Sequence, residues 1–171
     1  CVGTALMVFV DAPGRRHVEW RWATPLLLVL CVGAFVVLAL VDRATHDALL
    51  LRWGALSSAA ADWRSLLQPE RAATLVTTLG LHSSGTHLLG NMLFLLVFGL
   101  PAERALGSWR LLLLFIAGGA LANFVAALSM DRPDRVIIGA SGAVSTLIGA
   151  YLALFPTARL GVVLPLGLWL Q

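Results

Sequence analysis

Ile138-Gly139-Ala140-Ser141-Gly142-Ala143 is the stretch around which the rest of the chain can be interpreted. It opens an apolar run that continues to about Phe155. A serine between glycines, in sequence apolar enough to enter a membrane, costs free energy unless its hydroxyl is hydrogen-bonded or used. Ser141 is therefore the first candidate functional residue.

The composition is that of a membrane protein. Of 171 residues, 59% are hydrophobic and 12% are charged, and the mean hydropathy is +0.88. A soluble domain usually carries about twice that charged fraction. Lipid admits only helices or closed barrels, and continuous apolar runs argue against a barrel. The predicted fold is an all-α polytopic bundle of transmembrane helices.

Partners and cofactors follow from the same composition. The basic residues are all Arg and are scattered, so the pI near 9.7 does not indicate nucleic-acid binding. Cys1 and Cys31 are too few for a disulfide framework, and Cys31 is predicted to be a buried, inert thiol. We predict a lipid environment, with no cofactor and no metal site.

Apolar runs separated by charged residues predict four complete spans and a partial fifth. Residues 1–22 are the predicted N-terminal cytoplasmic flank, and 23–171 are a membrane domain expected to be incomplete at its C-terminus. The connection 42–80 is amphipathic and is expected to lie in the membrane interface. The predicted spans are Ala23 to Val41, Ser84 to Pro101, Leu111 to Met130, Val136 to Phe155, and a fifth from Leu160.

Loop charges predict the orientation. The outer connection 42–80 contains four Arg and four acids, whereas the short loops on the other side carry unbalanced Arg. Unbalanced charge in short loops marks the cytoplasmic side. The N-terminus is therefore predicted to be inside, in what we expect to be a bacterial inner membrane.

This orientation places three polar side chains at one depth. His87 and Asn91 lie about one turn into the second span, and Ser141 about one turn into the fourth. Both spans descend from the outer face, so the three side chains are expected together in the outer leaflet. A spacing of four puts His87 and Asn91 on one helix face. Flanking glycines permit close approach to Ser141, and a helix N-terminus offers free N–H groups to an oxyanion.

Several motifs together resemble one known family, the rhomboid intramembrane serine proteases, from about residue 23 onward. Either half of the pattern alone would be weak, but the order and spacing are specific. The motifs are His82-Ser-Ser-Gly-Thr-His87-Leu-Leu-Gly-Asn91-Met92, Gly99, Glu103-Arg104-Ala-Leu-Gly107 and Gly139-Ala-Ser141-Gly142.

The resemblance implies a serine endopeptidase that cleaves transmembrane segments of other proteins near the outer face. It implies that Ser141 is the nucleophile and that His87 and Asn91 support the oxyanion. Glu103 and Arg104 would hold the inner end of the bundle together, and Gly139 and Gly142 would support the nucleophile. The base would be a histidine on a sixth span, beyond this chain.

The sequence departs from the family pattern at two further positions. An Arg of the family's first loop would align with Thr74, and Arg71 is near but not aligned. The family's aromatic residue one turn after the nucleophile is replaced by Ser145.

Each of these polar residues, taken alone, has a purely structural explanation. A lone serine or histidine in a membrane helix usually packs or satisfies a neighbour, and Asn123 is expected to join helices. His82 is expected to be structural, and Glu103-Arg104 is equally explained as an interfacial ion pair. Combining Ser141 with His87 and Asn91 at matching depth favours catalysis.

Three other classes of protein contain comparable features. The main alternative is a non-proteolytic rhomboid-like protein that binds membrane helices without cutting them. A small transporter or channel would place polar residues at the midplane of paired repeats, and no such repeat is found. A soluble hydrolase would need strands around its serine turn, which the sequence lacks.

Overall fold

A computed structural model describes residues 7–10, 20–57, 63–130, 135–157, 160–163 and 169–170. Most of the predicted cytoplasmic flank and most of the charged turn between the third and fourth spans lie outside the described residues. The same holds for four of the twelve arginines, which are Arg15, Arg16, Arg132 and Arg159.

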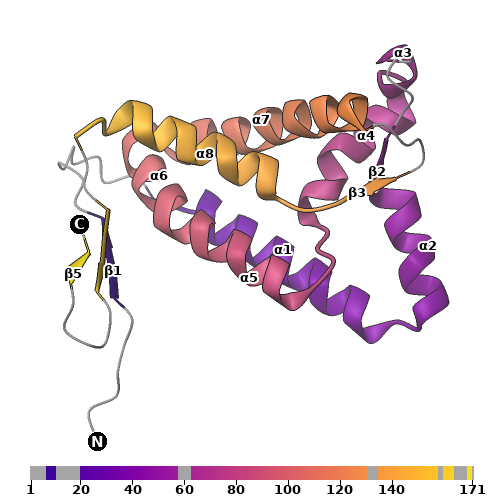
Figure 1. The fold of residues 1–171 in the computed structure, drawn as a ribbon, viewed down its shortest axis with the longest axis horizontal. Helices are drawn as coiled ribbons and strands as arrows, with labels where there is room; N and C mark the ends of the chain where they lie inside the picture. The colour runs from indigo at the N-terminus through magenta and orange to yellow at the C-terminus, as the bar shows by residue number, and fades with distance from the viewer. Residues whose placement is uncertain are drawn as a thin grey trace, which may run out of the picture.

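Three long apolar segments form the bundle (Figure 1). Two are single helices, and the third is a continuous run of α5, the π-helical turn η2 and α6. Each is long and apolar enough to cross a membrane. They are α1 (Ala23–Leu40), α5 (Gly85–Phe94) with η2 (Leu95–Gly99) and α6 (Leu100–Leu106), and α7 (Ser108–Ser129).

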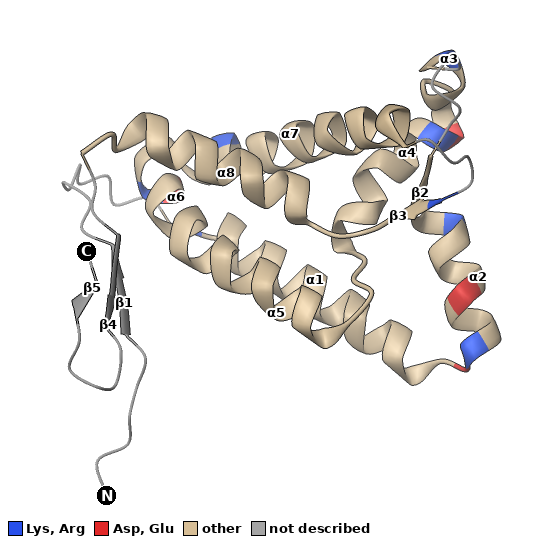
Figure 2. Ribbon diagram, in the orientation of Figure 1, with Lys and Arg blue, Asp and Glu red and all other residues tan. Residues whose placement is uncertain are grey.

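Charged side chains lie at the two ends of this bundle, and the middle of the long helices carries none (Figure 2). One group lies around α6 and the start of α7, and the other around α2 (Arg43–Trp53) and α4 (Pro69–Thr77). A charge-free band between two charged ends is what a bilayer requires. The chain is therefore an integral membrane protein with several apolar helices.

The fourth predicted span is shorter than expected. Helix α8 runs from Ser141 to Leu154, which is 14 residues, and does not begin at Val136. Strand β3 (Val136–Ile137) pairs instead with β2 (Ala55–Leu56) in an antiparallel ladder. Ser141 is consequently the first residue of its helix, and not one turn inside it as predicted.

The prediction of a fifth span from Leu160 was wrong for the residues that the structure describes. Leu160–Val163 form strand β4, which pairs with β1 (Met7–Val10) and with β5 (Trp169–Leu170). A short apolar run suits a strand as well as a helix, and here the backbone N–H and C=O groups of β4 pair with those of β1 and β5. The fold is therefore mostly helical and not all-α.

The long connection between the first and second spans is largely helical. It comprises α2, β2, α3 (Trp63–Leu66), α4 and η1 (Thr78–Gly80). Asp42 caps α2, since its carboxylate accepts from Ala44 N at 3.0 Å and Thr45 N at 3.1 Å. The position of this connection in the membrane interface stays a prediction.

Small residues bring α7 and α8 into close contact. A Cβ added at Gly142 would lie 2.5 Å from Ala122 Cβ, and one at Gly118 would lie 2.4 Å from Thr146 Cγ2. Backbones approach closely in membrane bundles where side chains are small. Asn123 adds a hydrogen bond from its Nδ2 to the α4 carbonyl of Leu75 at 2.9 Å, so it joins helices as predicted.

Glu103 stabilises the end of the bundle away from α2, but without an ion pair. The second span continues to Leu106, so Glu103 lies within the helical run and not after it. Its buried carboxylate accepts from Ala23 N at 2.8 Å and from Thr24 N at 3.0 Å, which caps the N-terminus of α1. Ser108 Oγ donates to the same group at 2.5 Å. Arg104 is exposed and, in the described part of the chain, forms no salt bridge with Glu103.

The Glu103→Gln substitution should lower the free energy of unfolding by about 2 kcal/mol, because an amide N–H₂ would face one of the donors that the carboxylate now satisfies. The free energy is measured by reversible denaturation in detergent micelles. The exposed neighbour provides the control, since Arg104→Gln should change it by less than about 0.5 kcal/mol. Equal losses in the two variants would contradict the capping role.

Candidate active site

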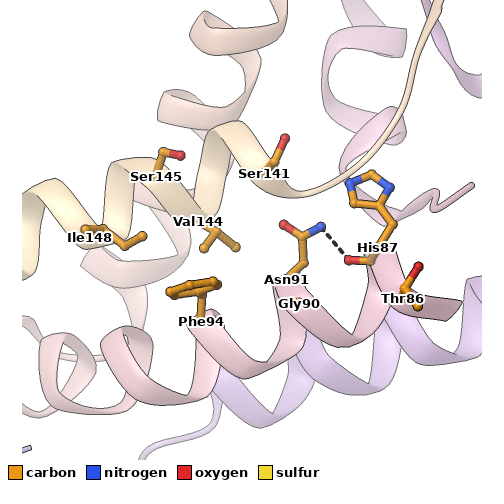
Figure 3. A pocket seen from close by; sticks show the side chains of 9 residues that line it. All are labelled: Thr86, His87, Gly90, Asn91, Phe94, Ser141, Val144, Ser145 and Ile148. Carbon is orange, nitrogen blue, oxygen red and sulfur yellow. Dashed lines mark hydrogen bonds between the residues drawn. The ribbon is translucent and has the colours of Figure 1, made fainter. Parts of the chain in front are cut away.

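A cavity of about 390 Å³ lies between α5 and α8, and the predicted polar residues line it (Figure 3). The two helices start at the same end of the bundle, near β2 and β3, and run in the same direction (Figure 1). Their first turns therefore face each other across the cavity. Its lining residues are Thr86, His87, Gly90, Asn91, Phe94, Ser141, Val144, Ser145 and Ile148.

Ser141 lies at the N-terminus of α8 with its side chain exposed. The first intrahelical donor of α8 is Val144, whose N–H donates to Ala140 O at 2.8 Å. The preceding N–H groups of the first turn have no partner within the helix. A hydroxyl beside such donors is a suitable place for an anion to form, because the helix dipole also favours negative charge there.

His87 and Asn91 lie one turn apart on α5 and face α8 (Figure 3). Asn91 is 6% exposed, and its Nδ2 donates to His87 O at 2.9 Å, which fixes the carboxamide. His87 Nδ1 lies 3.2 Å from Ser83 Oγ. The α5 N-terminus is set by Ser84, whose Oγ accepts from His87 N at 3.2 Å. Local capping thus places both side chains in the cavity wall.

Gly139 explains how the chain passes His87. Its φ of +120° is one that residues with a side chain rarely adopt. A Cβ at this position would also lie 2.6 Å from His87 Cε1 and 2.8 Å from His87 Nε2. The Cε1–Nε2 edge of the imidazole therefore lies against the backbone just before Ser141. No other residue type fits here without displacing the ring.

The segment before Ser141 is held from the other side by the long connection. Thr78 accepts from Gly139 N at 3.1 Å, and Thr78 Oγ1 donates to Ile137 O. Beyond β3, Arg135 and Ser57 exchange two hydrogen bonds of 2.8 Å, from Ser57 N to Arg135 O and from Arg135 N to Ser57 Oγ. These bonds fix where α8 begins.

Arg71 organises the same connection. It donates from Nη1 to Ser65 Oγ at 2.7 Å and from Nη2 to Leu56 O at 3.4 Å, so it bridges α3 and β2. Thr74 occupies the position at which the family has an Arg, and its Oγ1 donates to Arg71 O at 2.7 Å. Arg71 lies one turn earlier on α4, and its guanidinium is hydrogen-bonded to β2, the strand that pairs with β3.

His82 is a buried polar residue beside the cavity wall. It is 1% exposed, and its Nδ1 lies 3.2 Å from Gly80 O. It lies in the loop before α5, outside the spanning segments. Burial lowers its pKa, the contact with Gly80 O opposes that shift, and the charge of a protonated His87 would lower the pKa further.

The structure thus brings Ser141, His87 and Asn91 to one cavity and places the remaining predicted residues elsewhere. Gly139 and Gly142 flank the serine, through contact with His87 and with α7 respectively. Glu103 and Arg104 are not among the lining residues. Among the described residues no three His, Cys, Asp or Glu side chains gather as metal ligands.

Sequence reasoning missed the apolar half of the cavity, which Phe94, Val144 and Ile148 supply. The helical period contains the signal, since Val144 and Ile148 follow Ser141 by three and seven residues, and Phe94 follows His87 by seven. It also missed Ser83, which contacts His87, and Thr78, whose role depends on contacts that are distant in sequence.

Comparison with known proteins identifies the class. The chain matches the Rhomboid domain family over residues 69–170, and it belongs to the rhomboid family. It is 29% identical over 170 residues to "RHOMBOID-like protein 6, mitochondrial" of Arabidopsis thaliana, an alignment that covers 82% of this chain and 55% of that protein.

Bacterial and animal relatives are also similar to part of the chain. "Putative rhomboid protease YdcA" of Bacillus subtilis is 38% identical over 46% of this chain and 39% of its own length. "Presenilin-associated rhomboid-like protein A, mitochondrial" of Danio rerio is 33% identical over 48% of this chain and 22% of its own length. The chain spans about half the length, or less, of these curated relatives.

Gly139→Ala should lower the free energy of unfolding by more than about 1 kcal/mol, because it combines a disfavoured φ with a contact against His87. Gly149 is the matched control, since it lies inside α8 with nothing within 4 Å of an added Cβ. Gly149→Ala should leave stability unchanged or raise it by up to about 1 kcal/mol. Reversible denaturation measures both. Equal effects would refute the close approach at Gly139.

Stability should also fall on mild acidification. The pKa of folded His82 lies below its ordinary value of 6.5, so the unfolded chain binds the proton more readily. The free energy of unfolding is therefore undiminished by His82 above its ordinary pKa of 6.5, and it declines as the pH falls below that value toward the folded pKa. The unfolding temperature of the wild type should drop more between pH 7.5 and about 5.5 than that of His82→Phe. Parallel curves for the two proteins would contradict a depressed pKa.

Proposed function

We propose that this chain is the core of an intramembrane serine endopeptidase that cleaves transmembrane segments of other proteins near the outer membrane face. The observation that carries the proposal is the cavity between α5 and α8, which Ser141, His87 and Asn91 line together. Membership of the rhomboid family supports it, as does a relative whose name describes it as a rhomboid protease.

In the proposed reaction Ser141 Oγ attacks the peptide carbonyl and becomes bonded to its carbon. The carbonyl oxygen becomes an oxyanion, which collapses as the peptide C–N bond breaks, and the amine leaves with a proton. Water then releases the acyl group. The oxyanion is stabilised by His87, by the Asn91 amide and by first-turn N–H groups of α8, because each can donate a hydrogen bond toward it.

The serine needs a base to accept its proton. His82 is buried and does not line the cavity, and His87 is assigned to the oxyanion. We therefore assign the base to a histidine on a later span of the intact protein, in agreement with the family resemblance. Ser145 lines the cavity at the position where the family has an aromatic residue, so support for that imidazole would come from elsewhere.

The proposed substrates are membrane proteins whose transmembrane segment unwinds near the site. Peptide hydrolysis needs water, and the exposed Ser141 and Ser145 keep one side of the cavity polar. The proposed orientation has a cytoplasmic N-terminus and the site near the outer face of a bacterial inner membrane. The loop charges support the orientation, and the position of the cavity at one end of the bundle supports a site near a membrane face.

Ser141→Ala in the intact protein should abolish cleavage of a membrane-anchored reporter, and His87→Ala should reduce turnover by about 100-fold, as loss of an oxyanion donor does. Ser129→Ala should leave cleavage unchanged, because its exposed hydroxyl donates only to Val125 O within α7. A fluorophosphonate should label wild-type Ser141. Cleavage retained by Ser141→Ala would end the proposal, and folded wild-type protein that is neither labelled nor active would favour a non-proteolytic helix-binding protein.

A further inference from the structure

We propose that His82 is a positioning residue that holds the His87 imidazole in place beside Ser141. The inference rests on the proposed function, because it concerns the geometry of the assigned oxyanion site. It gives a role in the reaction to a side chain that does not itself line the cavity.

The two imidazoles are in direct contact. Their ring centroids lie 5.2 Å apart at an interplanar angle of 62°, which is an edge-to-face arrangement. His82 cannot rotate away, because it is buried and its Nδ1 lies 3.2 Å from Gly80 O. A carbonyl only accepts, so this contact assigns the proton to Nδ1 and fixes the plane of the ring. One side of His87 is therefore held by a ring of fixed orientation.

Gly139 holds His87 at another side. The Cε1–Nε2 edge of the imidazole faces the Gly139 backbone, and Nδ1 is engaged by Ser83 Oγ at 3.2 Å. The remaining polar atom, Nε2, is thus directed toward the segment that leads into Ser141. Contacts from His82, Gly139 and Ser83 leave the ring little freedom to turn.

Both His82 and Gly139 are attached to the same element, the three-residue helix η1. Gly80 accepts from His82, while Thr78 accepts from Gly139 N at 3.1 Å. The contacts form a closed circuit from η1 through His82, His87 and Gly139 back to η1. Because both contacts start from η1, this element sets the spacing between His87 and the start of α8. Helix η1 itself packs on α1 and α4.

His82 is not a candidate base in this arrangement. Its Nε2 is buried without a hydrogen-bond partner in the described part of the chain. A proton acceptor for Ser141 would have to reach the cavity, and the atoms of His82 do not line it. The ring therefore acts through His87, and its loss should impair turnover more than substrate binding.

The test separates the two contacts of His82 in the intact protein. His82→Phe keeps a buried ring against His87 and removes the donor to Gly80 O, whereas His82→Asn keeps a donor at the Nδ1 position and removes the ring. Each should lower kcat of reporter cleavage about tenfold with KM unchanged, which is less than the loss on removing an oxyanion donor. His46→Asn is the control, since His46 lies on α2 away from the cavity, and it should match the wild type.

A double-mutant cycle distinguishes positioning from general destabilisation. In the His87→Ala background, His82→Phe should cost no further activity, because the ring that it holds is gone. An undiminished tenfold loss in that background would overturn the proposal. So would wild-type kinetics in both single variants.

Two further measurements keep the inference independent of variant folding and of the proposed function. In histidine-labelled wild-type protein, NMR should show ring-proton contacts between His82 and His87 and a protonated Nδ1 on His82; their absence would refute the arrangement. Fluorophosphonate labelling separates the two failures. An unreactive wild-type Ser141 overturns the proposed function, whereas a reactive Ser141 with unchanged labelling rates in folded His82 variants overturns only the positioning role.

Discussion

Water is scarce in the hydrocarbon core, so polar groups that enter this bundle must be satisfied by other parts of the chain. Glu103 meets the requirement by accepting from the first N–H groups of α1, and Asn123 meets it by donating to Leu75 O. Thr78 does so twice, with Gly139 and with Ile137. Each bond joins segments distant in sequence. Apolar packing against lipid gives the helices little directional preference, so these bonds decide where one helix ends relative to another.

The candidate site differs, because its polar groups face an open cavity. Ser141 at the start of α8 and His87 and Asn91 on α5 line this cavity together. Its position depends on the strand pair β2–β3, on η1 and on the approach of Gly139 to His87. If Ser141 is the nucleophile, as proposed, a developing oxyanion would accept from the first-turn N–H groups of α8.

The sequence predicted α1 and α7 closely and the second span nearly so, because uninterrupted apolar runs leave lipid-facing helices as the one way to satisfy the backbone. It overextended α8 and predicted a helix at Leu160, since a short apolar run suits a strand as well as a helix. Pairing partners far along the chain made that choice. The π-helical turn at Leu95–Gly99 had no distinct sequence signal, and the acceptor role of Glu103 was masked by its neighbour Arg104.

By itself the sequence determined that this is a helical membrane protein of rhomboid type, and that His87 and Asn91 share a helix face. These properties depend on amino-acid composition, on the helical periodicity of side chains and on local residue spacing, which are all encoded in residues close together in the sequence. Only the tertiary structure decided that Ser141 begins its helix, that Gly139 lies against His87, and that Glu103 caps α1. The reason is physical: each depends on a contact between segments that the chain brings together only on folding, and no local pattern records which donor will meet which acceptor.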